Sequence, residues 1–148
     1  MAIWPYLLFG FLAGAMLPIQ FGINAQLAAW VESPLRATLV SFAVGTAALF
    51  VVMLAAYRDW PAAERIGGAP WWVWAGGLLG AFYVLGSVVS APRLGAATLV
   101  AVILAGQAFA SLAVDHFGWV GFEENPITPG RIAGIALVAV GVVLVRVF

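Results

Sequence analysis

Amide side chains lie within the first long apolar stretch of the chain. Gln20 and Asn24 follow Pro18 and are four residues apart, so in a helix they share one face, and Gln26 comes two residues later. Because an unsatisfied amide in lipid costs several kcal/mol, this face is expected to meet protein or water. Two interpretations fit: the amides line a solute pathway beside a proline-kinked helix, or they hydrogen-bond to neighbouring helices.

Hydroxyl groups form a stripe on a later apolar segment. Tyr83 and Ser87 continue a helical series that begins at Gly76 and Gly80 and ends at Ser90. The glycine end favours close helix packing, while the hydroxyl end suits either a cavity or further packing. We therefore group Tyr83 and Ser87 with the amides as candidate substrate-pathway residues. A similar stripe on an earlier segment consists of Thr38, Ser41 and Gly45.

A third group of polar residues follows. Gln107, Ser111 and Asp115 recur every four residues, and His116 comes directly after Asp115. Gln107 falls near the middle of its apolar segment and joins the candidate substrate-pathway residues. A carboxylate beside an imidazole is able to relay protons, so Asp115 and His116 are a candidate proton relay. The pair also fits a capping role at the helix end, and we favour this structural role because neither group lies deep.

The groups that most enzymes and metal proteins need are missing from the sequence. No acid or base lies near the expected middle of the membrane, and the chain has one histidine and no cysteine. These absences exclude a multi-histidine metal site and a buried Ser-His-Asp set, so we expect no enzymatic activity, metal or cofactor. Six basic and six acidic residues balance, so no basic patch indicates nucleic-acid binding.

Composition places these residues in a membrane. Of 148 residues, 65% are hydrophobic and 8% are charged, against about 25% charged residues in soluble domains. The charges leave five uncharged runs, and roughly 20 apolar residues span the hydrocarbon core. The last run is short, but Arg131 and Arg146 can extend it by reaching outward. We predict an all-α integral membrane protein, a helix bundle in a single transmembrane domain over 1–148. Its five helices are expected at about 3–30, 34–57, 70–91, 94–115 and 129–147.

Local sequence marks the ends of these helices. Ser33-Pro34 and Thr128-Pro129 match an N-cap followed by proline at the first helical position. Pro92 is expected to separate the third helix from the fourth, because the residue before a proline disfavours helical geometry. The seven tryptophans fall near the predicted ends, as in an interfacial aromatic belt. The first run lacks a positive start and is too long for a cleaved leader, so we expect it to be retained.

The arginines give no preferred orientation. Five crossings put three arginines on each side of the membrane, so the positive-inside rule favours neither orientation. Either Arg93 or Arg146 is shielded, leaving one orientation, or the chain inserts both ways and pairs antiparallel with itself. The two sets are Arg58, Arg65 and Arg131, and Arg36, Arg93 and Arg146.

Several stretches together resemble the YdcZ-type family of the drug/metabolite transporter superfamily. They are LPIQFGINAQL at 17–27, APRLGAA at 91–97, Gly106-Gln107, DHFG at 115–118, and Arg131 with Gly134. The resemblance covers nearly the whole chain. It implies a bacterial inner-membrane protein similar to half of a ten-helix transporter, in which two halves face opposite ways.

An analogy within that superfamily concerns assembly and substrate. As in the small multidrug exporters, two antiparallel copies would enclose a central pocket, and the last helix, which has no polar side chain from Ile132 to Val145, would contact the partner. Those exporters rely on a buried glutamate in the first helix, where this chain has Gln20 and Asn24. A pocket of amides, hydroxyls and aromatic rings suits neutral or zwitterionic solutes better than cations.

These observations lead to one expected function and two alternatives. We expect a small secondary transporter, surrounded by membrane lipid, that moves a small-molecule substrate across the bacterial inner membrane as an antiparallel homodimer, half of an inverted-repeat arrangement. The alternatives are a regulatory or structural membrane subunit without transport, and a lipid translocator. The expected substrate-pathway residues are Gln20, Asn24, Tyr83, Ser87 and Gln107.

Overall fold

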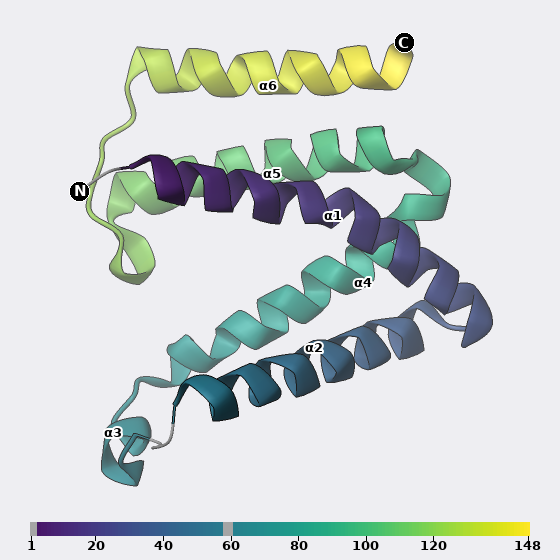
Figure 1. The fold of residues 1–148 in the computed structure, drawn as a ribbon. Helices are drawn as coiled ribbons and strands as arrows, with labels where there is room; N and C mark the ends of the chain where they lie inside the picture. The colour runs from purple at the N-terminus through teal and green to yellow at the C-terminus, as the bar shows by residue number, and fades with distance from the viewer. Residues whose placement is uncertain (1–2, 58–60) are drawn as a thin grey trace. The chain divides into compact units, whose positions relative to one another are not determined.

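Five helices long and apolar enough to cross a membrane dominate the computed structural model, which describes residues 3–57 and 61–148 (Figure 1). The described residues contain helices and no strand, so the predicted all-α class and the number of spans are confirmed. The spans are α1 (Trp4–Trp30), α2 (Pro34–Ala56), a 3₁₀ turn (Trp71–Ala75) continuing into α4 (Gly76–Leu94), α5 (Ala96–Phe117) and α6 (Pro129–Val147). The longer connections contain α3 (Ala63–Gly67) and a 3₁₀ turn (Trp119–Gly121).

The N-termini of α2 and α6 begin as the sequence predicts. The Ser33 hydroxyl accepts a hydrogen bond from the Arg36 backbone N–H at 3.3 Å, and the Thr128 hydroxyl accepts one from the Arg131 backbone N–H at 3.4 Å. A proline fills the first helical position in both cases. Each cap satisfies a backbone donor that has no partner within the helix.

The boundary between the third and fourth spans differs from the prediction. Pro92 lies inside the last turn of α4, which continues to Leu94, and the chain breaks at Gly95. Gly95 adopts φ 73°, a conformation that favours glycine because it has no Cβ. Placing the break at Pro92 was therefore wrong. The other predicted ends agree with the observed ones within two residues.

The helices form two compact units. The terminal unit consists of residues 1–18 and 93–148, and the central unit consists of residues 19–92. The chain passes between the units directly after Pro18, inside α1, and directly after Pro92, inside α4. Because proline has no N–H, each of these helices lacks one backbone hydrogen bond at the point where it passes between units.

The core of the central unit lies where α1 ends and α2 begins. Ala37, Val84 and Val88 are buried there, and side chains from the end of α1 and from α4 pack against them. Since lipid tails are as apolar as these side chains, van der Waals packing holds the three helices together. We call this cluster the apolar seal. Its members are Ala37, Val84 and Val88 with Leu27, Ala28, Val31 and Tyr83.

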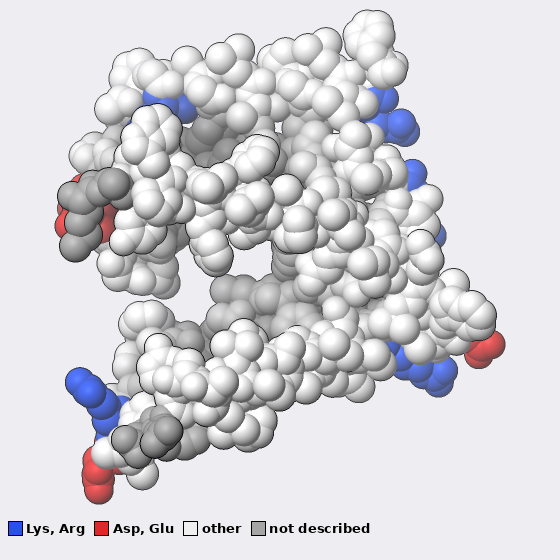
Figure 2. Space-filling model, in the orientation of Figure 1, with Lys and Arg blue, Asp and Glu red and all other residues white. Residues whose placement is uncertain are grey.

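In the terminal unit, α5 packs along α6. No residue of α6 is buried in the single chain, in keeping with a helix that faces lipid or a partner. Arg93 and Arg146 are exposed, so neither is shielded within the chain. The count therefore stays at three arginines on each side of the membrane. Among the described residues, charged side chains lie at helix ends and in connections, and the face drawn in Figure 2 is uncharged between them.

Candidate functional site

A pocket of about 330 Å³ lies between α1, α2 and α4 within the central unit. Gln20 projects into it from α1, beside hydroxyl groups of Ser41 and Thr46 on α2. Three of its lining residues are polar: Gln20 and Ser41 are half-buried, and Thr46 is exposed. The lining residues are Gln20, Ser41, Phe42, Gly45, Thr46, Leu49 and Val84.

These lining residues lie near the middle of their spans. Gln20 is three residues past the midpoint of α1, Val84 is within two residues of the midpoint of its span, and the α2 residues surround the midpoint at Gly45. At about 1.5 Å per residue, these offsets amount to roughly 6 Å or less along each helix. In a hydrocarbon core about 30 Å thick, the pocket therefore lies near the membrane midplane.

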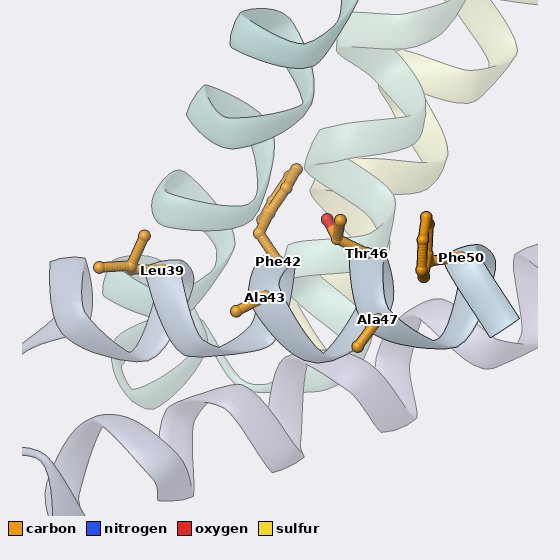
Figure 3. A pocket seen from close by; sticks show the side chains of 6 residues that line it. All are labelled: Leu39, Phe42, Ala43, Thr46, Ala47 and Phe50. Atoms are coloured by element: carbon orange, nitrogen blue, oxygen red, sulfur yellow. The ribbon is translucent and has the colours of Figure 1, made fainter.

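The pocket continues along α2 into a second hollow of about 560 Å³. The two share Phe42 and Thr46. In Figure 3, Phe42, Thr46 and Phe50 project from one side of α2, with Thr46 between the two rings. The Thr46 hydroxyl thus lies among apolar groups. The hollow is lined by Leu39, Phe42, Ala43, Thr46, Ala47 and Phe50.

Two buried polar atoms of the central unit have no hydrogen-bond partner among the described residues: Asn24 Nδ2 and Tyr83 Oη. Neither residue is among those that line the pocket. Asn24, only 3% exposed, lies one turn beyond Gln20 on α1. Tyr83 directly precedes Val84 of the pocket, and its ring meets Phe21 edge to face, with centroids 6.1 Å apart. An unpartnered buried group costs about 1–3 kcal/mol, so a hydrogen-bond partner for either atom would be stabilising.

Other buried hydroxyl groups are already hydrogen-bonded to their own helices. Ser87 donates to the Val84 carbonyl oxygen at 2.7 Å, and Thr38 donates to the Pro34 carbonyl oxygen at 2.9 Å. Such bonds are a common way for a hydroxyl group to be satisfied inside a helix. The Ser87 oxygen keeps lone pairs for accepting a hydrogen bond, while its proton is occupied.

The pocket has no charged lining residue. In the described part of the central unit, charged side chains lie near the connection after α1 or in the connection before α4. A charged group in the pocket would therefore lack a counter-ion there, which is costly in a medium of low polarity. The residues concerned are Glu32, Arg36, Glu64 and Arg65.

The structure brings four of the five expected substrate-pathway residues into one unit. Gln20 lines the pocket, Asn24 and Ser87 are buried, and Tyr83 is partly buried. Gln107 lies on α5 in the terminal unit, with an exposed side chain. Binding of a solute by these residues stays a prediction.

Asp115 and His116 join the end of α5 to the connection before α6. Asp115 forms an ion pair with Arg131, whose Nη1 also donates to the Asn125 carbonyl oxygen at 2.8 Å. The His116 Nδ1 accepts a hydrogen bond from the Ile127 N–H at 3.3 Å. These contacts favour the structural interpretation of the pair, and proton relay stays a prediction.

Sequence reasoning missed the pocket residues Phe42 and Thr46, and it missed the pairing of Arg131 with Asp115. On an apolar helix without strong periodicity, Phe42 and Thr46 resemble ordinary lipid-facing residues. The available signal was their position directly after Ser41 and Gly45 in the polar stripe. For this ion pair, the signal was the opposite charges of Asp115 and Arg131 at the two ends of one connection.

Comparisons with known proteins agree on one family. The chain matches the sequence profile described as "Putative inner membrane exporter, YdcZ" over residues 5–144. It is 32% identical over 134 residues to the inner membrane protein YdcZ of Escherichia coli (strain K12), covering 90% of this chain and 89% of that protein. No solved structure matches the chain.

Proposed function

Because the chain belongs to the YdcZ family, we propose that it is a small secondary transporter that moves a small solute through the pocket of its central unit. The family resemblance predicted from the sequence is confirmed. With five apolar spans and this family membership, the chain is a multi-pass protein of the inner membrane. The family's description as an exporter supports a role in transport rather than catalysis.

The position and lining of the pocket carry the proposal. Gln20, Ser41 and Thr46 meet near the midplane, where polar groups facing hydrocarbon are costly. Secondary transporters bind their substrates near the midplane, between helices that rearrange during transport.

The apolar seal supports the same mechanism. Its residues Leu27, Ala28, Val31 and Ala37 lie closer than the pocket to the ends at which α1 finishes and α2 begins, and Val84 belongs to both the seal and the pocket. In alternating access, a solute in the pocket would leave toward this face only after Leu27, Ala28 and Val31 separate from Ala37 and Val88. The seal would be one gate of the transporter.

We further propose that two copies work together as an antiparallel homodimer. An odd number of spans and an equal division of arginines between the two sides support insertion in both orientations. Two oppositely oriented copies supply the inverted repeats on which alternating access depends. On α6, the absence of buried residues leaves a face for contact with the partner.

Proteoliposomes would test the transport proposal. They would be loaded with a defined mixture of sugars, polyols, small amides and amino acids, and retention of each solute would be followed by mass spectrometry. We expect wild-type protein to accelerate the loss of at least one solute class. Gln20→Ala should slow that loss because it removes an amide from the pocket. The matched control is Gln26→Ala, since Gln26 is an exposed amide on the same helix.

Two other results would overturn the proposal. Equal retention in empty, wild-type and Gln20→Ala liposomes for every solute would favour a non-transporting membrane subunit. Scrambling of labelled phospholipid, without loss of any solute, would favour a lipid translocator. Normal solute flux by Gln20→Ala would remove Gln20 from the pathway.

A further inference from the structure

We propose that Asn24 and Tyr83 select the solute, and that they select uncharged molecules presenting a hydrogen-bond-acceptor oxygen, such as a carbonyl or hydroxyl oxygen. This inference rests on the proposed function and narrows its substrate class. It concerns two atoms, Asn24 Nδ2 and Tyr83 Oη, which we call the donor pair.

The hydrogen-bonding state of the donor pair indicates the polarity of its ligand. Both atoms are buried without a partner in the described chain, and both carry protons to donate. A molecule that offers an acceptor oxygen would satisfy them, whereas one that offers only donors would not satisfy Asn24 Nδ2. Nearby Ser87 is already bonded to the Val84 carbonyl oxygen, so its hydroxyl can only accept.

The absence of charge around the pocket indicates that the ligand is neutral. The pocket lining contains no ionisable side chain. A bound cation would find amide and hydroxyl oxygens but no carboxylate, and a bound carboxylate would find donors but no basic group. Burying either ion in this environment costs far more than burying a neutral amide or hydroxyl.

Aromatic side chains indicate the shape of the apolar part of the ligand. The Phe21 ring packs edge to face against Tyr83, and Phe42 lines the pocket from α2. A volume of about 330 Å³ lies at the lower end of the range for small-molecule sites. A small planar solute with one polar end fits this combination of apolar walls and hydrogen-bond donors.

Three probes of nearly identical shape separate these possibilities. Benzamide is neutral and offers a carbonyl oxygen, benzamidinium is a cation without an acceptor, and benzoate is an anion. Binding of each to the purified protein in nanodiscs would be titrated by saturation-transfer NMR, with empty nanodiscs correcting for partition into lipid. We expect both ions to bind at least about tenfold more weakly than benzamide.

Two variants test the donor pair itself. Asn24→Leu removes the amide at nearly constant size, and Tyr83→Phe removes the hydroxyl while keeping the ring against Phe21. Each should weaken benzamide binding about 3- to 10-fold, the contribution of one hydrogen bond. The matched control, Gln26→Leu, removes an exposed amide from the same helix and should leave binding unchanged.

The stability of Asn24→Leu provides an independent readout. Because Asn24 Nδ2 has no partner in the chain, this variant should unfold at a temperature no lower than that of the wild type. A purely structural role for the amide predicts the opposite. If Asn24→Leu fails to fold, the Asn24 amide is already hydrogen-bonded within the protein, and Asn24 is no longer part of the donor pair. Tyr83→Phe still tests the hydroxyl group.

The outcomes distinguish this inference from the proposed function. Tighter binding of benzamidinium or benzoate, no binding of benzamide, or unchanged binding by both variants would overturn the donor-pair inference. Solute flux that depends on Gln20 would leave the transporter proposal intact in that case. Conversely, selective benzamide binding without flux of any solute would support the donor pair and overturn transport.

Discussion

Gly80 on α4 lies against the ring of Phe42 on α2: a Cβ added at Gly80 would stand 3.5 Å from Phe42 Cζ. This is an ordinary van der Waals separation, so a methyl group fits but a longer side chain does not. Because Phe42 also lines the pocket, the contact links the packing of the two helices to the shape of the site.

Gly80→Leu should therefore destabilise the protein and narrow the pocket. Additional carbon atoms in a packed interface typically cost about 1–3 kcal/mol, and relief of the clash would push the Phe42 ring toward the pocket. Thermal unfolding in nanodiscs would measure the first effect, and benzamide binding the second. Gly77→Leu is the matched control, because a Cβ at Gly77 has no neighbour within 4 Å. Equal stability of the two leucine variants would show that α2 and α4 do not approach at Gly80.

The ion pair between Asp115 and Arg131 should make a small contribution to stability. Both side chains are about 30% exposed, and partly exposed pairs contribute about 0.2–1 kcal/mol. A double-mutant cycle with Asp115→Asn and Arg131→Gln would isolate this coupling from the bond that Arg131 donates to the Asn125 carbonyl oxygen. The coupling should weaken as salt is raised. No coupling even at low salt would mean that the pair does not fasten α5 to the start of α6.

Much of the fold could be predicted because the membrane imposes simple rules. Runs without charge located the five spans, and the caps at Ser33 and Thr128 fixed two helix starts to the residue. The wrong boundary at Pro92 has a local cause. A proline near the end of a helix removes one backbone hydrogen bond, but the helix can continue past it. The positive φ of Gly95, in contrast, ends the helix.

The candidate site was harder to predict because membrane helices have weak periodicity. The amides and hydroxyls were found by their polarity alone, and Gln20 indeed lines the pocket. Nothing in an apolar helix shows which side faces its neighbours, so the roles of Phe42 and Thr46 stayed hidden. Which donors lack partners depends on contacts between helices, which a single sequence does not reveal.

Pro18 should favour movement at the expense of stability. Having no N–H, it leaves the Gly14 carbonyl oxygen without its usual bond, at the point where α1 passes between the two units. Pro18→Ala restores that bond, so we expect stability to rise by about 1–3 kcal/mol. We expect a lower transport rate for the solute identified in proteoliposomes, with unchanged binding, because hinge positions absorb conformational change.

Pro5→Ala is the control for this effect. Pro5 lies in the first turn of α1, where the backbone N–H has no partner within the helix in any case, so its replacement should change neither stability nor rate. A faster transporter after Pro18→Ala, or one with lower stability, would contradict the assignment of Pro18 as a hinge.

The orientation of the chain should be mixed. Five spans place the connections 58–69 and 117–129 on the same side of the membrane, and the arginines favour neither side. Since the chain contains no cysteine, Ala62→Cys and Glu123→Cys introduce single thiols without background. Both positions are exposed. In intact cells, a membrane-impermeant thiol reagent should label about half of each population, and permeabilisation should complete the labelling.

The pattern across the two sites decides between the possible assemblies. Half labelling at both sites supports insertion in two orientations, which an antiparallel homodimer requires. Complete labelling or complete protection at both sites would mean a single orientation, and the inverted half would then have to come from a different chain. Opposite results at the two sites would place them across the membrane from each other. That result would mean that either the span ending in α4 or α5 does not cross, because two crossings between the connections keep them on one side.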